Sequence, residues 1–168
     1  MTKTAIVTGA SSGIGRAIAK KLASEGIKVA LVARREDKLT ALAEAINEGT
    51  GGKALAVPVD VSHRIEVESM VRKVEEHFGA IDVYVNNAGL MLNALVTDGQ
   101  VENWEHMIDV NIKGVLYGAN AVIPSMLERK TGHIINIASV SGFEVTKRST
   151  VYSATKFAVR AISMGLEK

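Results

Sequence analysis

The chain has 168 residues, of which 47% are apolar, and its 20 basic and 18 acidic side chains leave a formal net charge of +2. At about 150 residues per domain, this length predicts a single domain over residues 1–168 with a core of useful size. The absence of cysteine excludes disulfides, thiolate metal sites and a cysteine nucleophile. The near balance of charge argues against a nucleic-acid partner, and no apolar run is long enough for a membrane span.

Segments typical of strands and helices alternate along the chain. We expect a strand at 4–7, a helix at 14–24, a strand at 28–33, a helix at 37–48, a strand at 54–61, a helix at 64–78, a strand at 81–85, a helix at 101–128, a strand at 133–137 and a helix at 150–168. Several of the strands are apolar at consecutive positions, as a strand covered on both faces requires. The alternation predicts an α/β fold with a doubly wound parallel sheet.

Two of the helices carry more specific expectations. In the first helix, Ile14, Ala17, Ile18 and Leu22 fall on one side and predict its buried face. In the long helix, Pro124 is expected to bend the helix or to end its regular part, because proline has no N–H to donate.

The first strand leads directly into a glycine-rich turn, Thr8-Gly9-Ala10-Ser11-Ser12-Gly13-Ile14-Gly15. Glycine allows positive φ angles and lets the backbone approach a pyrophosphate, and the start of the following helix attracts the anion. Such a turn is weak support by itself, and the alternative is a plain tight turn. Because a strand precedes it and a helix follows it, we predict a dinucleotide site that includes Gly9, Ser11, Ser12, Gly13, Ile14 and Gly15.

The spacing Thr-Gly-x-x-x-Gly-x-Gly resembles the short-chain dehydrogenase/reductase family, and further motifs extend the resemblance over the whole chain. Asn86-Asn87-Ala88-Gly89 follows the fourth strand, and Tyr152-Ser153-Ala154-Thr155-Lys156 matches the family's Tyr-x-x-x-Lys. Ser139 precedes the tyrosine by the family's spacing, and Asn111 stands where the family has a helix asparagine. The resemblance implies a Rossmann-like oxidoreductase that acts on a small alcohol or carbonyl compound and forms a homodimer or homotetramer.

The cofactor is expected to be selected at the end of the second strand. An NAD site carries an acidic side chain about 20 residues past the glycines, whereas this sequence has Ala33-Arg34-Arg35. Guanidinium groups bind a 2′-phosphate through charge-assisted hydrogen bonds, so we predict NADP(H), with Arg34 favoured and Arg35 as a second contact. The alternative is that both arginines are solvated surface charges.

The resemblance implies further cofactor contacts beyond the glycine turn. Asp60 and Val61 are expected at the adenine, although Asp60 would serve equally well as a cap for the next helix. The residues expected further into the site are Asn87, Ala88, Gly89, Tyr152 and Lys156.

Tyr152 and Lys156 are four residues apart on an expected helix, so their side chains project from one face. A tyrosine hydroxyl has an ordinary pKa of about 10, and a nearby ammonium lowers it toward the range useful for proton transfer. On its own this spacing usually marks only a helix surface. Together with the glycine turn, Ser139 and Asn111, it predicts a catalytic site.

The resemblance implies a role for each of these residues. Tyr152 exchanges the hydroxyl proton, Ser139 polarises the substrate oxygen, and Lys156 also orients the nicotinamide ribose. Asn111 holds a water that links Lys156 to solvent. Ser141 competes for the serine role, but the spacing to the tyrosine favours Ser139. The four histidines show no metal-ligand spacing, so no metal is expected.

Family members run to roughly 250 residues, a normal size for a single α/β domain. The chain is therefore expected to be truncated, without the last strands of the sheet and the loop that closes over the substrate. Substrate identity is left open, and Lys147 and Arg148 either attract an acidic substrate or face solvent. No basic-then-apolar leader precedes the first strand, so we expect a cytoplasmic location.

Two other functions are open at this point. A non-catalytic NADP-binding or scaffold protein of the same fold would have no need of the Tyr152 and Lys156 pair. A sugar-nucleotide epimerase or dehydratase of the related extended family would prefer Thr-Gly-x-x-Gly-x-x-Gly, which residues 8–15 do not fit.

Overall fold

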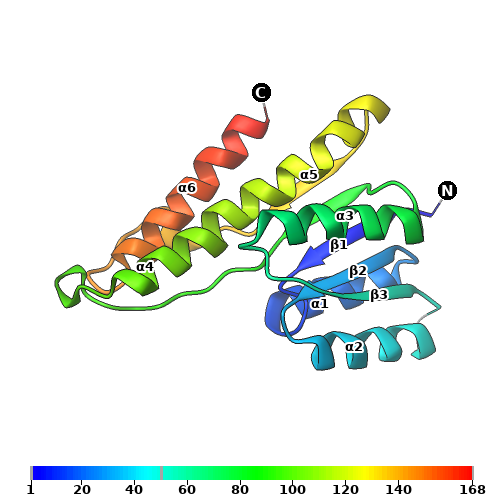
Figure 1. Ribbon diagram of the computed structural model, residues 1–168, viewed down its shortest axis with the longest axis horizontal. Helices are drawn as coiled ribbons and strands as arrows, with labels where there is room; N and C mark the ends of the chain where they lie inside the picture. Colours follow the sequence, from blue (N-terminus) through cyan, green and yellow to red (C-terminus); the bar gives the residue numbers. More distant parts are fainter. Residues whose placement is uncertain (1, 50, 168) are drawn as a thin grey trace.

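A computed structural model describes residues 2–49 and 51–167, in which strands and helices alternate around a five-stranded sheet (Figure 1). The elements in chain order are β1 (Thr4–Thr8), α1 (Gly13–Ser24), β2 (Lys28–Ala33), α2 (Glu36–Gly49), β3 (Lys53–Pro58), α3 (Arg64–Phe78), β4 (Val83–Asn86), α4 (Val101–Ile108), α5 (Gly114–Arg129), β5 (His133–Asn136) and α6 (Thr150–Leu166). The strands lie in the order β3-β2-β1-β4-β5, and neighbouring strands pair in parallel. The predicted doubly wound parallel sheet is confirmed.

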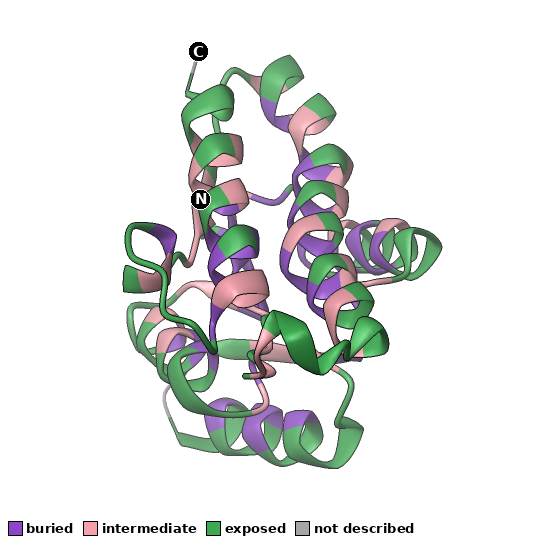
Figure 2. Ribbon diagram, turned by 90° about the vertical axis from the view of Figure 1, so that its left-hand side faces the viewer, coloured by how far each residue is buried: buried purple, intermediate pink, exposed green. Residues whose placement is uncertain are grey.

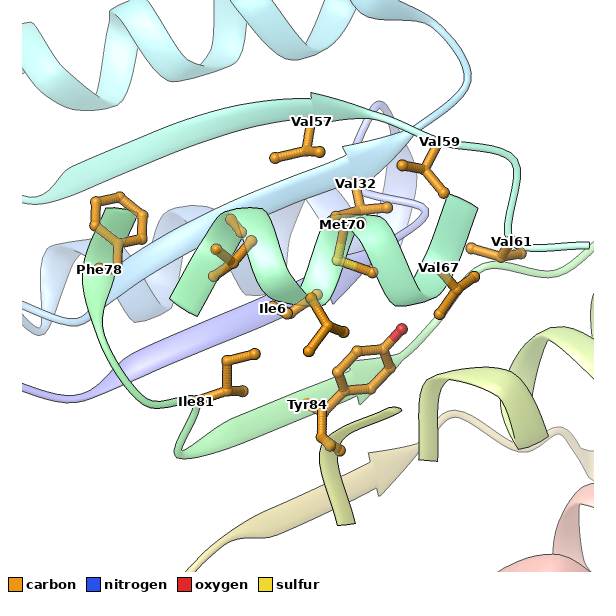
Figure 3. Packing of buried hydrophobic residues seen from close by; sticks show 14 of the residues in the cluster. Ile6, Val32, Val57, Val59, Val61, Val67, Met70, Phe78, Ile81 and Tyr84 are labelled. Carbon is orange, nitrogen blue, oxygen red and sulfur yellow. The ribbon is translucent and has the colours of Figure 1, made fainter. Parts of the chain in front are cut away.

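The two faces of the sheet bury separate apolar clusters, because alternate residues of a strand point to opposite faces. Ile6 belongs to the cluster under α3 and α5, and its neighbour Val7 belongs to the cluster under α1 and α2. Figure 2 shows the buried residues of the helices turned inward and their outer sides exposed. Figure 3 shows the first cluster, in which Tyr84 lies among aliphatic side chains. Covering on both faces explains why the strand sequences are apolar without alternation.

The buried face of α1 matches the prediction in part, because Ile18 and Leu22 pack against the core, but it differs at Ile14 and Ala17. Ile14 is 63% exposed and Ala17 is also exposed, whereas Gly15, Ala19 and Ala23 are buried. The small residues let the helix axis approach the sheet closely, which a face of larger side chains would prevent. Ile14 is thereby left at the glycine turn, facing a cleft.

The strand β3 is shorter than predicted and ends at Pro58 instead of Val61. Pro58 has no N–H, and the last contact with β2 is the bond from the Val59 N–H to the Ala33 carbonyl at 2.9 Å. The chain then leaves the sheet. This difference puts Asp60 and Val61 beyond the carboxyl end of the strand, where a ligand can reach them.

Pro124 does not end the long helix, so that part of its prediction was wrong. α5 continues past Pro124 to Arg129, and a π-helical turn, η2 (Asp109–Lys113), joins α4 to α5. Pro124 and Asn120 are both exposed, so water can satisfy the carbonyl that the proline leaves without a donor. The π turn instead coincides with Asn111, which it directs inward.

The last helix, predicted to Lys168, runs to Leu166, and Lys168 lies outside the described residues. None of the helices in the described part of the chain has the length and apolar character needed to cross a membrane. Within residues 2–49 and 51–167, histidine and carboxylate side chains form no cluster of three that would hold a metal ion.

Candidate functional site

A cleft of about 540 Å³ opens at the carboxyl ends of the strands, beside β1 and β4. Among the residues that line it are twelve of those predicted to bind the cofactor, namely Gly9, Ser11, Ser12, Gly13, Ile14, Arg34, Arg35, Asp60, Val61, Asn87, Ala88 and Gly89. A larger groove of about 970 Å³ between α5, β5 and α6 contains none of them. Ligands of doubly wound sheets bind where the strand order reverses, which here is between β1 and β4, so the smaller cleft is the candidate site.

The glycine turn is packed tightly against the loop that follows β4. Gly9 has φ +65°, and a Cβ on it would lie 2.7 Å from the Asn87 Nδ2 atom. A Cβ on Gly15 would overlap the Gly9 carbonyl oxygen. Larger residues at either position would therefore push the turn out of the cleft. Within α1, which is described throughout, the first turn carries no acidic side chain, so no carboxylate of the helix itself offsets its positive end at the cleft.

Thr8 joins the two loops that form the floor of the cleft. Its Oγ1 accepts hydrogen bonds from the N–H groups of Asn87 and Ala88, both at 3.0 Å, and donates to the Val85 carbonyl at 3.2 Å. Asn87 in turn donates from Nδ2 to the Thr8 carbonyl at 3.0 Å. The sequence analysis gave Thr8 no role of its own, because its partners lie about 80 residues away and only the sheet brings them together.

The two arginines predicted to select the cofactor lie at one end of the cleft. The Arg35 Nη2 atom donates to Ser11 Oγ at 2.9 Å and to Ser12 Oγ at 3.0 Å, which fixes its guanidinium beside the glycine turn. Arg34 is exposed and also lines the cleft. Two positive charges therefore flank the turn, one of them held in place by hydrogen bonds.

Asp60 lies at the same end and takes its hydrogen bonds from Ser62. Its Oδ1 accepts from the Ser62 N–H at 3.0 Å and from Ser62 Oγ at 2.7 Å. Burial acts to raise the pKa of Asp60, but these hydrogen bonds and the charges of His63 and Arg34 outweigh it and lower the pKa. His63, not Asp60, occupies the N-cap position of α3, although its side chain makes no capping hydrogen bond, and the Asp60 carboxylate lies at the edge of the cleft.

Lys156 connects the helix α6 to the segment that follows β5. It is 7% exposed, and its Nζ donates to the Ile137 carbonyl at 3.0 Å. The same Nζ lies 5.8 Å from the centre of the Tyr152 ring, and burial lowers the pKa of Lys156. Ser139 follows Ile137 closely and begins a short 3₁₀ turn, η3 (Val140–Gly142), with its Oγ accepting from the Ser141 N–H at 3.2 Å. Tyr152, Lys156 and Ser139 are thus held on two segments that contact each other.

Asn111 is buried in the π turn and makes three hydrogen bonds through its side chain. Oδ1 accepts from the Leu90 N–H at 2.9 Å, and Nδ2 donates to the Leu90 carbonyl at 2.8 Å and to Thr155 Oγ1 at 3.1 Å. Thr155 itself donates to the Tyr152 carbonyl at 2.6 Å. Asn111 therefore ties the loop after β4 to α6. The sequence analysis missed Thr155, whose signal is weak because a hydroxyl inside a helix usually bonds only its own helix.

Gly89 marks the place where the cleft meets this polar cluster. A Cβ on Gly89 would lie 3.3 Å from Asn111 Oδ1 and 3.7 Å from Lys156 Nζ, while Gly89 also lines the cleft. A ligand that runs from the glycine turn along Asn87, Ala88 and Gly89 would therefore end beside the Lys156 ammonium. Ser139, Tyr152, Lys156 and Asn111 are not part of the cleft lining, but the side chains of Lys156 and Asn111 adjoin its inner end at Gly89.

Comparisons with known proteins point to one family. The sequence profile of a family described as short chain dehydrogenase matches residues 3–168. An uncharacterized oxidoreductase of Staphylococcus saprophyticus is 57% identical over 166 residues, which cover 99% of this chain and 71% of that protein.

Solved structures with this fold hold either form of the nicotinamide cofactor. An alcohol dehydrogenase of Thermococcus sibiricus, complexed with 5-hydroxy-NADP, matches with a TM-score of 0.95 at 35% identity and covers 99% of this chain and 71% of its own. A short chain dehydrogenase/reductase of Burkholderia phymatum in complex with NAD matches with a TM-score of 0.94 at 32% identity, over 98% of this chain and 59% of its own.

Proposed function

The chain belongs to the short-chain dehydrogenase family of oxidoreductases, and from this membership we propose that it transfers a hydride between NADP(H) and a small alcohol or carbonyl compound. One observation carries the proposal. The inner end of the nucleotide cleft, at Gly89, adjoins both Lys156 Nζ and Asn111 Oδ1. A bound dinucleotide would therefore lie next to an acid–base group. Binding of the nucleotide alone does not require such a group at that place.

The residues present fit a dinucleotide. The cleft volume of about 540 Å³ lies in the range of small-molecule sites, and its glycine turn leaves the backbone bare where a pyrophosphate would lie. Gly9, Ser12 and Gly13 would hold the pyrophosphate, and Asp60 and Val61 would contact the adenine. The nicotinamide ring, when bound, supplies or accepts the hydride.

The proton and the substrate oxygen are handled by the chain's own residues. We assign Tyr152 the exchange of the hydroxyl proton and Ser139 the hydrogen bond to the substrate oxygen. Lys156 supplies a positive charge beside the tyrosine ring and orients the ribose. Asn111 Oδ1 retains one lone pair after its bond from Leu90 and faces the same glycine as the ammonium, which supports a relay water between them.

The preference for NADP(H) over NAD(H) is supported by the two arginines. A 2′-phosphate near Ser11 and Ser12 would meet the guanidinium of Arg35, which those hydroxyls already orient, and Arg34 lies at the same end. A preoriented guanidinium loses less entropy on binding an anion than a free one does.

NADPH oxidation with a panel of small ketones and aldehydes tests the reaction. We expect Tyr152→Phe to abolish turnover while NADPH binding persists, and Tyr117→Phe, a half-buried tyrosine of α5, to leave turnover unchanged. Equal turnover by Tyr152→Phe and the wild type would disprove the assigned proton transfer. NADPH binding without turnover of any carbonyl would instead favour the scaffold protein.

The cofactor preference needs its own comparison. Arg35→Ala is expected to weaken NADPH binding by about 10- to 100-fold, the range for a charge-assisted hydrogen bond, with little effect on NADH. Arg72→Ala, an exposed arginine of α3, is the matched control. An equal loss for NADH and NADPH would contradict a 2′-phosphate contact.

We also propose that copies of the chain associate into a homodimer or homotetramer through α4, α5 and α6. Met107, on α4, is buried, but large apolar side chains remain exposed on these helices: Ile108 by 39%, Leu116 by 44%, Phe157 by 41% and Met164 by 58%. Sedimentation equilibrium tests this, with Leu116→Glu expected to shift the protein toward the monomer. A monomeric wild type would refute the association.

A further inference from the structure

One face of α6 carries three polar side chains that each donate to a backbone carbonyl of the segment 137–144. Ser153 Oγ donates to Glu144 at 3.4 Å, Lys156 Nζ donates to Ile137 at 3.0 Å, and Arg160 Nη1 donates to Gly142 at 2.8 Å. Their spacing of three and four residues puts them on one side of the helix. These bonds hold the segment that carries Ser139 against the helix that carries Tyr152.

Arg160 makes the shortest of the three bonds and also contacts the turn through an aromatic ring. Its guanidinium carbon lies 3.8 Å from the centre of the Phe143 ring and 5.9 Å from that of Phe157. Phe143 is 64% exposed, so apolar burial alone does little to fix its position. The stacked guanidinium therefore holds the residue that directly follows η3.

The turn and the helix are also in close steric contact at this point. A Cβ on Gly142 would lie 3.0 Å from the Lys156 carbonyl oxygen and 3.2 Å from Arg160 Cδ. The turn therefore lies close enough to the helix that a side chain at Gly142 would be crowded, and the Arg160 hydrogen bond opposes movement of the turn away from the helix. The separation of Ser139 from α6 is thereby set from both directions.

We propose that Arg160 is a positioning residue, which fixes the turn of residues 139–143 on α6 so that Ser139 and Tyr152 reach the same substrate oxygen. The inference rests on the proposed function, because it gives Arg160 a part in placing Ser139. Arg160 touches no reacting atom. Its effect comes through geometry, and a displacement of about 1 Å in a catalytic group can cost about 100-fold in rate.

Hydrogen exchange tests the anchoring without any substrate. Arg160→Met keeps an apolar stem and removes the guanidinium, and we expect the amides of Ser141, Gly142 and Phe143 to exchange about 10-fold faster or more, with the amides of β1 unchanged. Arg160→Lys, which keeps the charge and one donor, should restore part of the protection. Arg72→Met on α3 is the control for loss of one exposed charge. Wild-type exchange of the turn in Arg160→Met would overturn the proposal.

Phe143→Leu provides a second variant that leaves the arginine in place, in case Arg160→Met does not fold. Removal of the exposed cation–π contact should speed exchange of the same turn amides by about 2- to 5-fold. Exchange of these amides at the wild-type rate in Phe143→Leu would show that the guanidinium does not hold the turn through the ring.

Kinetics then separate positioning from a merely structural role. With a carbonyl compound that the wild type reduces, Arg160→Met should lower kcat per NADPH-binding site by about 10- to 100-fold and leave KM for NADPH unchanged, because the nucleotide cleft lies elsewhere. A structural role would lower the number of NADPH-binding sites and keep kcat per site, and that result would refute the proposal. A wild type that reduces no carbonyl would refute the proposed function, while the exchange experiment would still decide whether Arg160 anchors the turn.

Discussion

Replacement of Asn111 by leucine tests whether the buried amide joins the nucleotide loop to α6. Leucine has the same number and branching of side-chain heavy atoms, so the change removes the hydrogen bonds and keeps the shape of the side chain, although its two methyl groups are larger than the amide atoms. Three bonds are lost, and the N–H and carbonyl of Leu90 lose their side-chain partner. Asn111 is 1% exposed, so water has little access to this position to replace the lost bonds.

The magnitude follows from the lost bonds. A hydrogen bond contributes a net of about 1 kcal/mol, and a buried polar group left unpaired costs about 1 to 3 kcal/mol. Leu90 is only half-buried, which favours the lower end of that range. We therefore expect a loss of about 3 kcal/mol in the free energy of unfolding. For a protein of this size, that loss lowers Tm by roughly 6 to 12 °C.

Urea unfolding followed by circular dichroism gives the measurement, and Asn120→Leu gives the control. Asn120 is exposed on α5 and receives the same chemical change, so its effect should stay within about 0.5 kcal/mol. If Asn111→Leu lost less than about 1 kcal/mol, or no more than Asn120→Leu, the amide would not be the link that the hydrogen bonds indicate.

Three further outcomes are expected. Gly15→Ala should abolish NADPH binding, because its Cβ would overlap the Gly9 carbonyl oxygen. NADPH titration measures this, with Gly165→Ala as the control, since no neighbouring atom of the described residues lies within 4 Å of a Cβ added there. Tyr84→Phe should raise stability by about 1 kcal/mol in thermal unfolding, because the buried Tyr84 hydroxyl has no hydrogen-bond partner among residues 2–49 and 51–167. A drop in Tm would contradict this cause. Because burial lowers the pKa of Lys156, the folded protein binds fewer protons than the unfolded chain between the two pKa values. The stability of the wild type relative to Lys156→Met should therefore rise with pH between the lowered pKa of the folded protein and the ordinary lysine pKa of about 10.4, and a fall over that range would contradict the direction of the shift.

The sequence alone determined the order of the elements and the identity of the residues around the cleft. An unbroken apolar run such as Val29 to Val32 indicates by itself a strand that is buried on both faces. The glycines of the turn likewise indicate a backbone conformation that larger residues rarely adopt. These are local constraints, carried by neighbours in the chain. The glycine turn and the two arginines could be named from such patterns, whereas Asp60, Val61, Asn87, Ala88 and Gly89 were expected only from the resemblance to a known family. Twelve of the residues expected at the cofactor line one cleft.

Features that depend on residues distant in the sequence were decided only by the tertiary structure. The buried face of α1 is set by how closely the helix approaches the sheet, so Ala19 and Ala23 turn inward in place of Ile14. The π turn at Asn111 depends on Leu90 and Thr155, which lie 21 and 44 residues away.

Arg160 likewise contacts Gly142 only because the segment after β5 lies against α6. Each of these partnerships joins residues far apart in the chain. Their geometry is fixed by packing in three dimensions and not by the pattern of any one segment.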